Sequence, residues 1–95
     1  MEKTVKAARS IGAHLRTWRK MLSLPVLVVA ERARVSRSTV QRLEAGDLGV
    51  SIGSVLAVAA GLGILDSIVD STDPMNTDFG RAQLANRLPQ RVRVV

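Results

Sequence analysis

Two short helical segments with almost no chain between them constrain this fold more than any other feature of the sequence. The first segment carries the small residues Ala30 and Ala33, and the second begins after Ser36. Ser36 suits a helix N-cap because its side-chain oxygen can accept a backbone N–H at the start of the following helix. Arg34 and Val35 leave room only for a tight turn, and a small residue at position 30 lets the second helix cross closely over the first. We therefore expect a closely packed pair of helices.

Apolar residues recur at helical spacing along most of the chain, which predicts an all-α fold. The predicted helices cover residues 8–22, the segment from Pro25 to Ala33, residues 37–45, the segment after Ser51 as far as Leu62, and residues 64–71. Their inward residues are expected to be Ile11, Leu15, Trp18, Leu22, Val29, Ala30, Ala33, Val40, Leu43, Ile52, Val55, Leu56, Ala59, Leu62, Leu65, Ile68 and Val69. A strand over residues 24–29 is the alternative for that stretch, but Pro25 suits the first turn of a helix and charged residues follow.

These segments predict one compact five-helix domain over residues 9–72, preceded by a flexible N-terminus, residues 1–8. Residues 73–95 form a C-terminal extension with a short helix over residues 78–87, capped at Thr77, and a basic tail. The last six residues, "QRVRVV", alternate Arg and Val in the period of a strand, so they either pair as an edge strand across a dimer or stay disordered. We predict disorder in the free monomer.

Composition agrees with a small helical domain. The 95 residues suit one domain, and with one Trp and one Phe the core must consist of Ala, Leu, Ile and Val. Cysteine is absent, which excludes disulfides and cysteine-based zinc sites and fits a reducing cytoplasm. Residues 1–10 contain no apolar run, so no secretory signal is expected and the chain is predicted to be cytoplasmic.

Residues 48–65 form an uncharged run of 18 positions, which is the lower limit for a membrane span. Four Gly and two Ser interrupt the run, and no Lys, Arg or aromatic anchor lies near it. We therefore predict a buried helix that breaks near Gly61 and Gly63, and no membrane partner.

Positive charge is unevenly distributed. Residues 1–44 contain ten Lys or Arg against three Glu, residues 45–80 contain five Asp and no Lys or Arg, and residues 81–95 contain four Arg and no acid. A basic N-terminal half beside an acidic middle segment predicts that one face of the protein meets a polyanion.

The segment "VSRSTVQRLEAG", residues 35–46, is the most specific pattern in the chain, with Gly46 as the expected left-handed helix stop. Together with the helices around it, this segment resembles the Xre or Cro type of helix-turn-helix domain over about two thirds of the chain. The resemblance implies a lambda-repressor-like fold in which the helix after Ser36 is a recognition helix that lies in the major groove of DNA.

The resemblance also implies which residues touch DNA. Contacts with base edges are implied for Arg37, Ser38, Gln41 and Arg42, because Arg can donate two hydrogen bonds to guanine and Gln can pair similarly with adenine. Contacts with phosphates are implied for Ser36, Thr39, Arg34, Gly46 and Gly49. A structural ion pair between the first and third helices is implied for Arg19 and Glu44.

The chain departs from the family pattern at two places. Pro25 and Val26 replace the Ser or Thr and the Gln that usually open the second helix, so a cap and a phosphate contact are lost. Arg34 replaces the glycine of the turn, and a non-glycine residue in a left-handed conformation costs around 1 kcal/mol. Val26, Leu27 and Val28 cannot all point inward on one helix, so either they form an exposed apolar patch that meets a partner or the helix is packed differently, and we look for a partner at this patch.

No enzyme is expected from this sequence. His14 is the only histidine, and the carboxylates are too scattered to form a catalytic triad or a metal cluster within one subunit. We expect no cofactor and no metal, and we expect His14 to lie on the surface.

The core followed by the "LPQRVR" tail further resembles HipB-like antitoxins, which bind their own operator as dimers and contact a HipA-type kinase toxin. The leading hypothesis is therefore a homodimeric repressor of this type, whose partners are operator DNA and a HipA-like kinase. A stand-alone, phage-like transcription regulator and an interaction module that has lost DNA binding remain as alternatives.

Overall fold

The computed structural model describes the backbone of residues 1–94 and the side chains of residues 1–87. Within this range the chain is all-α, as predicted, and contains no strand. The elements are α1 (Glu2–Met21), α2 (Val26–Ala33), α3 (Arg37–Glu44), α4 (Ile52–Leu62), α5 (Leu65–Thr72), the short 3₁₀ turn η1 (Pro74–Asn76) and α6 (Asp78–Val94). None of these helices is both long enough and apolar enough to cross a membrane.

The chain divides into two compact units, residues 1–65 and residues 66–95. The five-helix count for the N-terminal domain is therefore not met, because this unit contains α1 to α4 and only the first residue of α5. Gly63 adopts a left-handed conformation and ends α4, and α5 contributes no buried side chain. A helix that buries nothing adds little to a core, even where its apolar spacing is helical.

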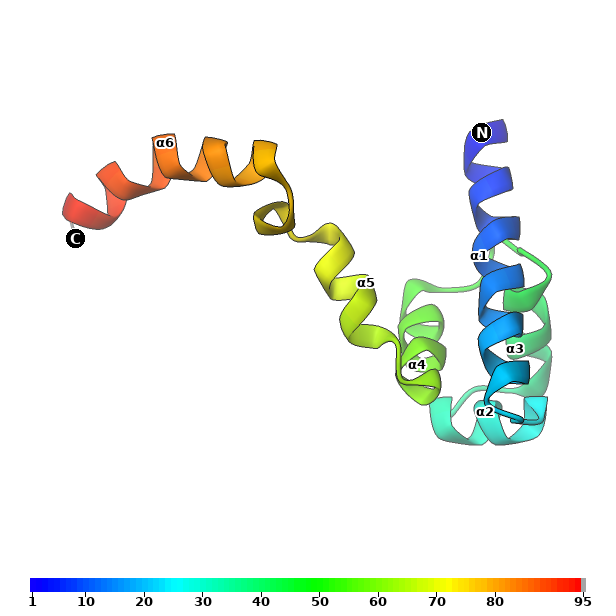
Figure 1. Ribbon diagram of the computed structural model, residues 1–95. Helices are drawn as coiled ribbons and strands as arrows, with labels where there is room; N and C mark the ends of the chain where they lie inside the picture. The colour runs from blue at the N-terminus through cyan, green and yellow to red at the C-terminus, as the bar shows by residue number, and fades with distance from the viewer. Residues whose placement is uncertain (95) are drawn as a thin grey trace. The chain divides into compact units, whose positions relative to one another are not determined.

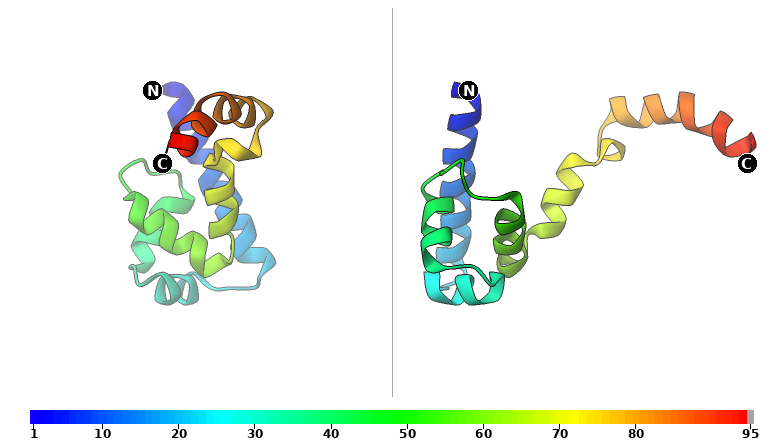
Figure 2. Two further views of the ribbon diagram at one scale, coloured as in Figure 1. Left: turned by 90° about the vertical axis from the view of Figure 1, so that its left-hand side faces the viewer. Right: turned by 180° about the vertical axis from the view of Figure 1, so that it is seen from behind.

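Helix α1 begins at Glu2, earlier than the predicted residue 8. Residues 2–8 hold good helix formers such as Lys and Ala, but most of their side chains are exposed and give no apolar period to detect. The first turns of α1 project beyond the other helices of the N-terminal unit (Figures 1 and 2).

The core of the N-terminal unit consists of small and medium aliphatic side chains. α2 packs against α3 and α4, and α1 packs along α3 (Figure 1). The buried apolar residues are Leu15, Val29, Ala30, Ala33, Val40, Leu43, Val58, Ala59 and Leu62. The inward residues predicted for α2 and α3 are thus confirmed.

The inward face of α1 differs from the prediction. Leu15 is buried, but Ile11 is 50% exposed, Trp18 41% and Leu22 45%. The buried stripe is instead centred on Gly12 and Leu15, because α3 packs against Gly12. Glycine carries no apolar side chain, so apolar spacing alone predicts a face that is rotated slightly about the helix axis from the one that is buried.

Helix α4 shows a similar shift. Ile52 is 76% exposed, whereas Val58, which was not predicted to point inward, is 2% exposed. Val58, Ala59 and Leu62 form the buried side of α4, and the first turn of the helix lies outside the core.

The turn between α2 and α3 adopts the strained geometry that was predicted for Arg34. Arg34 has a φ of 56° and a ψ of 42°, the left-handed conformation that favours glycine. The Val35 N–H then donates to the Ala30 carbonyl at 3.0 Å, and Ser36 caps α3 by accepting the Thr39 N–H at 3.0 Å. The turn closes with satisfied hydrogen bonds despite the strain.

Gly46 ends α3 as predicted, with a φ of 84°. Its N–H donates to the Leu43 carbonyl and the Asp47 N–H donates to the Arg42 carbonyl, each at 3.0 Å. This pair of bonds is a Schellman motif, which satisfies two of the free carbonyls at the end of the helix. Ser51 then caps α4 by accepting the Ser54 N–H at 3.1 Å.

The C-terminal unit turns sharply before α6. Asp73 accepts the Met75 N–H at 2.9 Å, and Thr77 accepts the Gly80 N–H at 2.9 Å, as expected for a cap at that position. Helix α6 continues to Val94, so residues 90–94 are helical rather than extended or disordered, and Val95 lies outside the described residues. An Arg and Val alternation of this length specifies a strand only where a neighbouring strand pairs with it, and residues 1–94 offer none.

We predict that Gly12→Ala destabilises the N-terminal unit by about 2–3 kcal/mol, because core overpacking against backbone cannot relax by a rotamer change. A Cβ at position 12 would lie 2.4 Å from the Leu43 carbonyl oxygen and 2.7 Å from that of Glu44. Urea unfolding followed by circular dichroism measures the change. Gly53→Ala is the matched control, since its new Cβ would meet only the Ser51 hydroxyl at 3.8 Å, and equal loss in both variants would contradict the prediction.

Candidate nucleic-acid interface

The outward face of α3 presents a row of polar side chains. Val40 and Leu43 point into the core, which leaves Arg37, Ser38, Gln41 and Arg42 on the opposite side, and all four are exposed. The spacing of these four residues puts them on one face of the helix. Helix α3 therefore offers a continuous surface of hydrogen-bond donors and acceptors.

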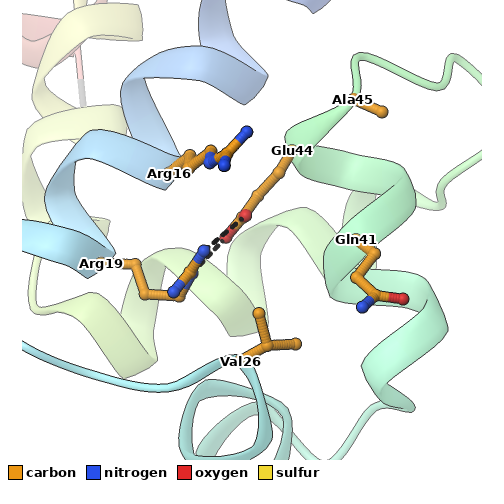
Figure 3. A pocket seen from close by; sticks show the side chains of 6 residues that line it. All are labelled: Arg16, Arg19, Val26, Gln41, Glu44 and Ala45. Atoms are coloured by element: carbon orange, nitrogen blue, oxygen red, sulfur yellow. Dashed lines mark hydrogen bonds and ion pairs between the residues drawn. The ribbon is translucent and has the colours of Figure 1, made fainter.

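The start of α2 lies beside this face. One groove, which we call the recognition groove, is lined by Pro25, Val26 and Leu27 from the start of α2 and by Arg37, Ser38 and Gln41 from α3. A second hollow next to it is lined by Arg16, Arg19, Val26, Gln41, Glu44 and Ala45 (Figure 3). Val26 and Gln41 border both, so the two hollows form one surface.

The three apolar residues predicted as a partner patch are not equivalent. Leu27 is 48% exposed, and Val26 and Val28 are half-buried. Val26 also packs against the core, and only Val26 and Leu27 line the recognition groove. The apolar surface is therefore part of the same groove as the residues implied to read bases.

Arg19 and Glu44 form a two-pronged ion pair. Arg19 Nε donates to Glu44 Oε2 at 2.7 Å and Nη2 donates to Oε1 at 3.0 Å (Figure 3). Arg19 Nη1 also donates to the Leu24 carbonyl at 3.1 Å. The two side chains are only 12% and 11% exposed, and the hydrogen bond with Glu44 raises the pKa of the Arg19 guanidinium, against the opposing effect of its burial.

The Arg19 pair fixes three segments relative to one another. Glu44 is the last residue of α3, Arg19 is near the end of α1, and Leu24 belongs to the connection that leads into α2. Two parallel charge-assisted hydrogen bonds hold a guanidinium in one plane, so they define an orientation as well as a contact. The pair therefore sets the position of the exposed face of α3 beside the start of α2.

The hydroxyl groups of Ser36 and Thr39 are partly used within the protein. They lie 2.9 Å apart and share one hydrogen bond, and Ser36 also accepts the Thr39 N–H. Because two hydroxyl groups have two protons and share one, one O–H remains available to donate to a phosphate oxygen. Arg34, at the exposed turn before them, offers a guanidinium at the same end of α3.

Arg42 is tied to the loop that follows α3. Arg42 Nε donates to Asp47 Oδ2 at 2.8 Å, and the other oxygen of the same carboxylate accepts the Gly49 N–H at 2.7 Å. The hydrogen bond from Arg42 has the largest effect on the pKa of Asp47 and lowers it, and the hydrogen bond from the Gly49 N–H lowers it further. The carboxylate consequently stays ionised and the pairing persists until the pH falls through that lowered pKa.

The N–H groups of Gly46 and Gly49, two residues implied to contact phosphates, already donate hydrogen bonds within the protein. The Gly46 N–H donates to the Leu43 carbonyl at 3.0 Å, and the Gly49 N–H donates to Asp47 at 2.7 Å. Asp47 was not among the predicted site residues, although it lies only five residues after Arg42 and directly follows the helix stop Gly46. Its carboxylate accepts hydrogen bonds from Arg42 and from the Gly49 N–H, two groups that the resemblance assigned to DNA contacts.

Arg16 is a further basic residue that the sequence analysis did not assign to the site. It is exposed on α1 and lines the hollow that contains Gln41 (Figure 3). Arg16 is one residue from the buried Leu15 and is exposed, and which residues it neighbours depends on how α1 packs along α3. His14 is exposed, and the groove does not include it.

A family model described as a helix-turn-helix domain matches residues 10–70, about two thirds of the chain. The chain belongs to the helix-turn-helix domain family. No curated protein and no solved structure gives a significant match. Membership indicates a DNA-binding regulator, and α2 and α3 are the two helices of the helix-turn-helix.

We predict that Glu44→Gln lowers the free energy of unfolding of the helix-turn-helix domain by about 3 kcal/mol, because Arg19 then keeps its charge in a nearly buried place without a counter-charge. Urea unfolding at neutral pH measures this loss. Glu31→Gln is the matched control, since Glu31 is exposed, and a loss of the same size there would show that net charge and not the ion pair is responsible.

Proposed function

We propose that this protein is a sequence-specific DNA-binding transcription regulator that represses its own operon from the cytoplasm, and that its role is binding rather than catalysis. The recognition groove carries the proposal. It brings Arg37, Ser38 and Gln41 to one exposed surface on the first turns of α3, the part of a recognition helix that contacts base edges.

The distribution of charge supports a DNA partner. Residues 1–65 contain ten Lys or Arg and four acidic residues, whereas residues 66–95 contain four Arg and four Asp. The whole formal net charge of +6 therefore lies on the unit that carries the recognition groove. A positive unit of this kind attracts a polyanion from a distance and binds it in a salt-dependent way.

Base reading is assigned mainly to Arg37 and Gln41. Both are exposed and line the recognition groove. Arg42 lies further along α3, donates its Nε to Asp47 and does not line the recognition groove. We therefore rank Arg42 below Arg37 as a base contact, with Ser38 beside them and Ser36, Thr39 and Arg34 at the phosphates.

We further propose that the protein binds its operator as a homodimer. A single module of this size covers one half-site, and two-fold operators of helix-turn-helix dimers place their half-sites about one helical turn apart. Sedimentation of the protein with a two-half-site duplex tests this stoichiometry, and one chain per duplex at saturating protein would contradict it.

We predict that Arg37→Ala weakens specific binding to the DNA upstream of the protein's own gene by about tenfold or more, since a bidentate contact with guanine is lost. Fluorescence anisotropy against this DNA and against a scrambled duplex, over a range of salt concentrations, separates specific from electrostatic binding.

Arg32→Ala is the matched control for the loss of one positive charge. Arg32 Nη1 donates to the Gly61 carbonyl at 3.1 Å, so this arginine is directed at α4 and not at the recognition groove. If Arg37→Ala and Arg32→Ala lower the specific affinity equally, or if the wild-type protein does not distinguish the two duplexes, the proposed function is wrong.

A second candidate role is that of an antitoxin that binds a HipA-like kinase. The observation in its favour is the C-terminal unit, which contributes no lining residue to the recognition groove and exposes a large aromatic side chain. Phe79 is 75% exposed and borders a hollow with Pro74 and Leu84. An exposed aromatic beside an apolar hollow is typical of a protein-binding surface.

We predict that a kinase-like product of the adjacent gene, if co-expressed, co-purifies with the full chain and that Phe79→Ser abolishes this association while DNA binding persists. Ile52→Ser is the matched control, because Ile52 is equally exposed, at 76%, but lies in the N-terminal unit. A neighbouring gene that encodes no kinase, or retention of the kinase by Phe79→Ser, argues for the stand-alone regulator.

A further inference from the structure

Val26 and Leu27, next to Pro25, form an apolar side of the recognition groove, opposite the polar side chains of α3. Leu27 is 48% exposed, and Val26 is half-buried beside Gln41 (Figure 3). Arg37, Ser38 and Gln41 complete the recognition groove. The ligand of this groove must therefore offer hydrogen-bonding groups and an apolar group side by side.

The edges of base pairs in the major groove carry one apolar group, the C5-methyl of thymine. Resting on the proposed DNA-binding function, we propose that Val26, with Leu27 beside it, contacts the methyl group of a thymine adjacent to the base that Gln41 reads. The two apolar residues then act as specificity determinants, and the site prefers a thymine at that one position of the operator.

The packing of Val26 suits such a role. Its side chain rests partly on the apolar core while its remaining surface faces the groove, so its position is fixed by the fold and not by the ligand. Pro25 precedes it as the N-cap of α2, with a φ of −66° that the proline ring holds in place. A fixed apolar contact discriminates between bases better than a mobile one because binding then costs little ordering of the side chain.

Charge favours DNA over a protein as the occupant of this groove. Arg37 lines the groove, Arg16 lines the adjoining hollow next to Val26, and the unit around them carries the formal charge of +6. Val28, the third member of the predicted patch, does not line the groove and has no part in the proposal. A protein partner for Val26 and Leu27 is retained as an outcome of the test.

The test begins with a pool of short duplexes with a randomised centre, from which the wild-type protein selects its preferred sequence. Each thymine of the selected sequence is then replaced in turn by uracil, which keeps every hydrogen-bonding group and lacks only the methyl. We expect a loss of about fourfold in affinity at one position, the value of one buried methyl group, and little change at the others.

The protein side of the test uses Val26→Ala and Leu27→Ala, with Val28→Ala as the matched control. Val26→Ala should bind the thymine duplex more weakly than wild type does and should no longer distinguish thymine from uracil at the sensitive position. Val28→Ala should keep the wild-type ratio of the two affinities. Because the readout is a ratio on two duplexes, a small loss of stability in any variant does not alter it.

The outcomes separate this inference from the function on which it rests. If the pool yields no preferred sequence, the proposed function fails and the inference fails with it. If a sequence is selected but no uracil substitution lowers the affinity, or Val26→Ala keeps the wild-type ratio, only the thymine contact is wrong. Unchanged DNA binding by Val26→Ala and Leu27→Ala would assign the patch to a protein partner and overturn the proposal.

Discussion

The attachment of the end of α3 to α1 is the interaction on which the rest of the N-terminal unit depends. Arg19 reaches both oxygens of Glu44 and the Leu24 carbonyl, and Gly12 lets the last carbonyls of α3 approach α1 more closely than any side chain would allow. The hydrogen bonds of Arg19 set the orientation of α3 relative to α1, and the close approach at Gly12 sets the distance between the two helices. Without them the aliphatic core is non-directional and does not by itself specify which face of α3 is exposed.

A core of Ala, Val and Leu places its own demands on the fold. Val29, Val40 and Val58 are the largest side chains that are no more than 2% exposed. Short side chains bring helices close together, so the turns that connect the helices must hold the backbone in one well-defined conformation. Arg34 in a left-handed conformation and the Schellman motif at Gly46 define the backbone conformation at the two ends of α3.

The sequence predicted what depends on local chemistry. The caps at Ser36 and Thr77 and the stop at Gly46 follow from properties of single residues and their neighbours, whereas the left-handed Arg34 was implied by the family pattern. The outward face of α3 was also predictable, because Val40 and Leu43 define its inner side. The implied pairing of Arg19 with Glu44 came from the family resemblance and not from spacing.

The features that sequence reasoning missed arise from packing. The face of α1 is centred on Gly12, which has no hydropathic signal, and Val58 replaces Ile52 because only the later turns of α4 reach the core. Asp47 captures Arg42 and the Gly49 N–H because the Schellman turn directs the chain back along α3. The place of Val26 beside Gln41 likewise depends on how α2 crosses α3.

The Arg42–Asp47 pair makes the two ends of the recognition helix electrically different. At the C-terminal end of α3 an aspartate neutralises the arginine, whereas Arg34 and Arg37 at the other end are exposed. A polyanion that approaches the exposed face of α3 therefore meets exposed guanidinium groups at the first turn of the helix and a paired one at its last turn. Arg9 of α1, which lies against Gly46, supplies positive charge at the C-terminal end of α3 from a different helix.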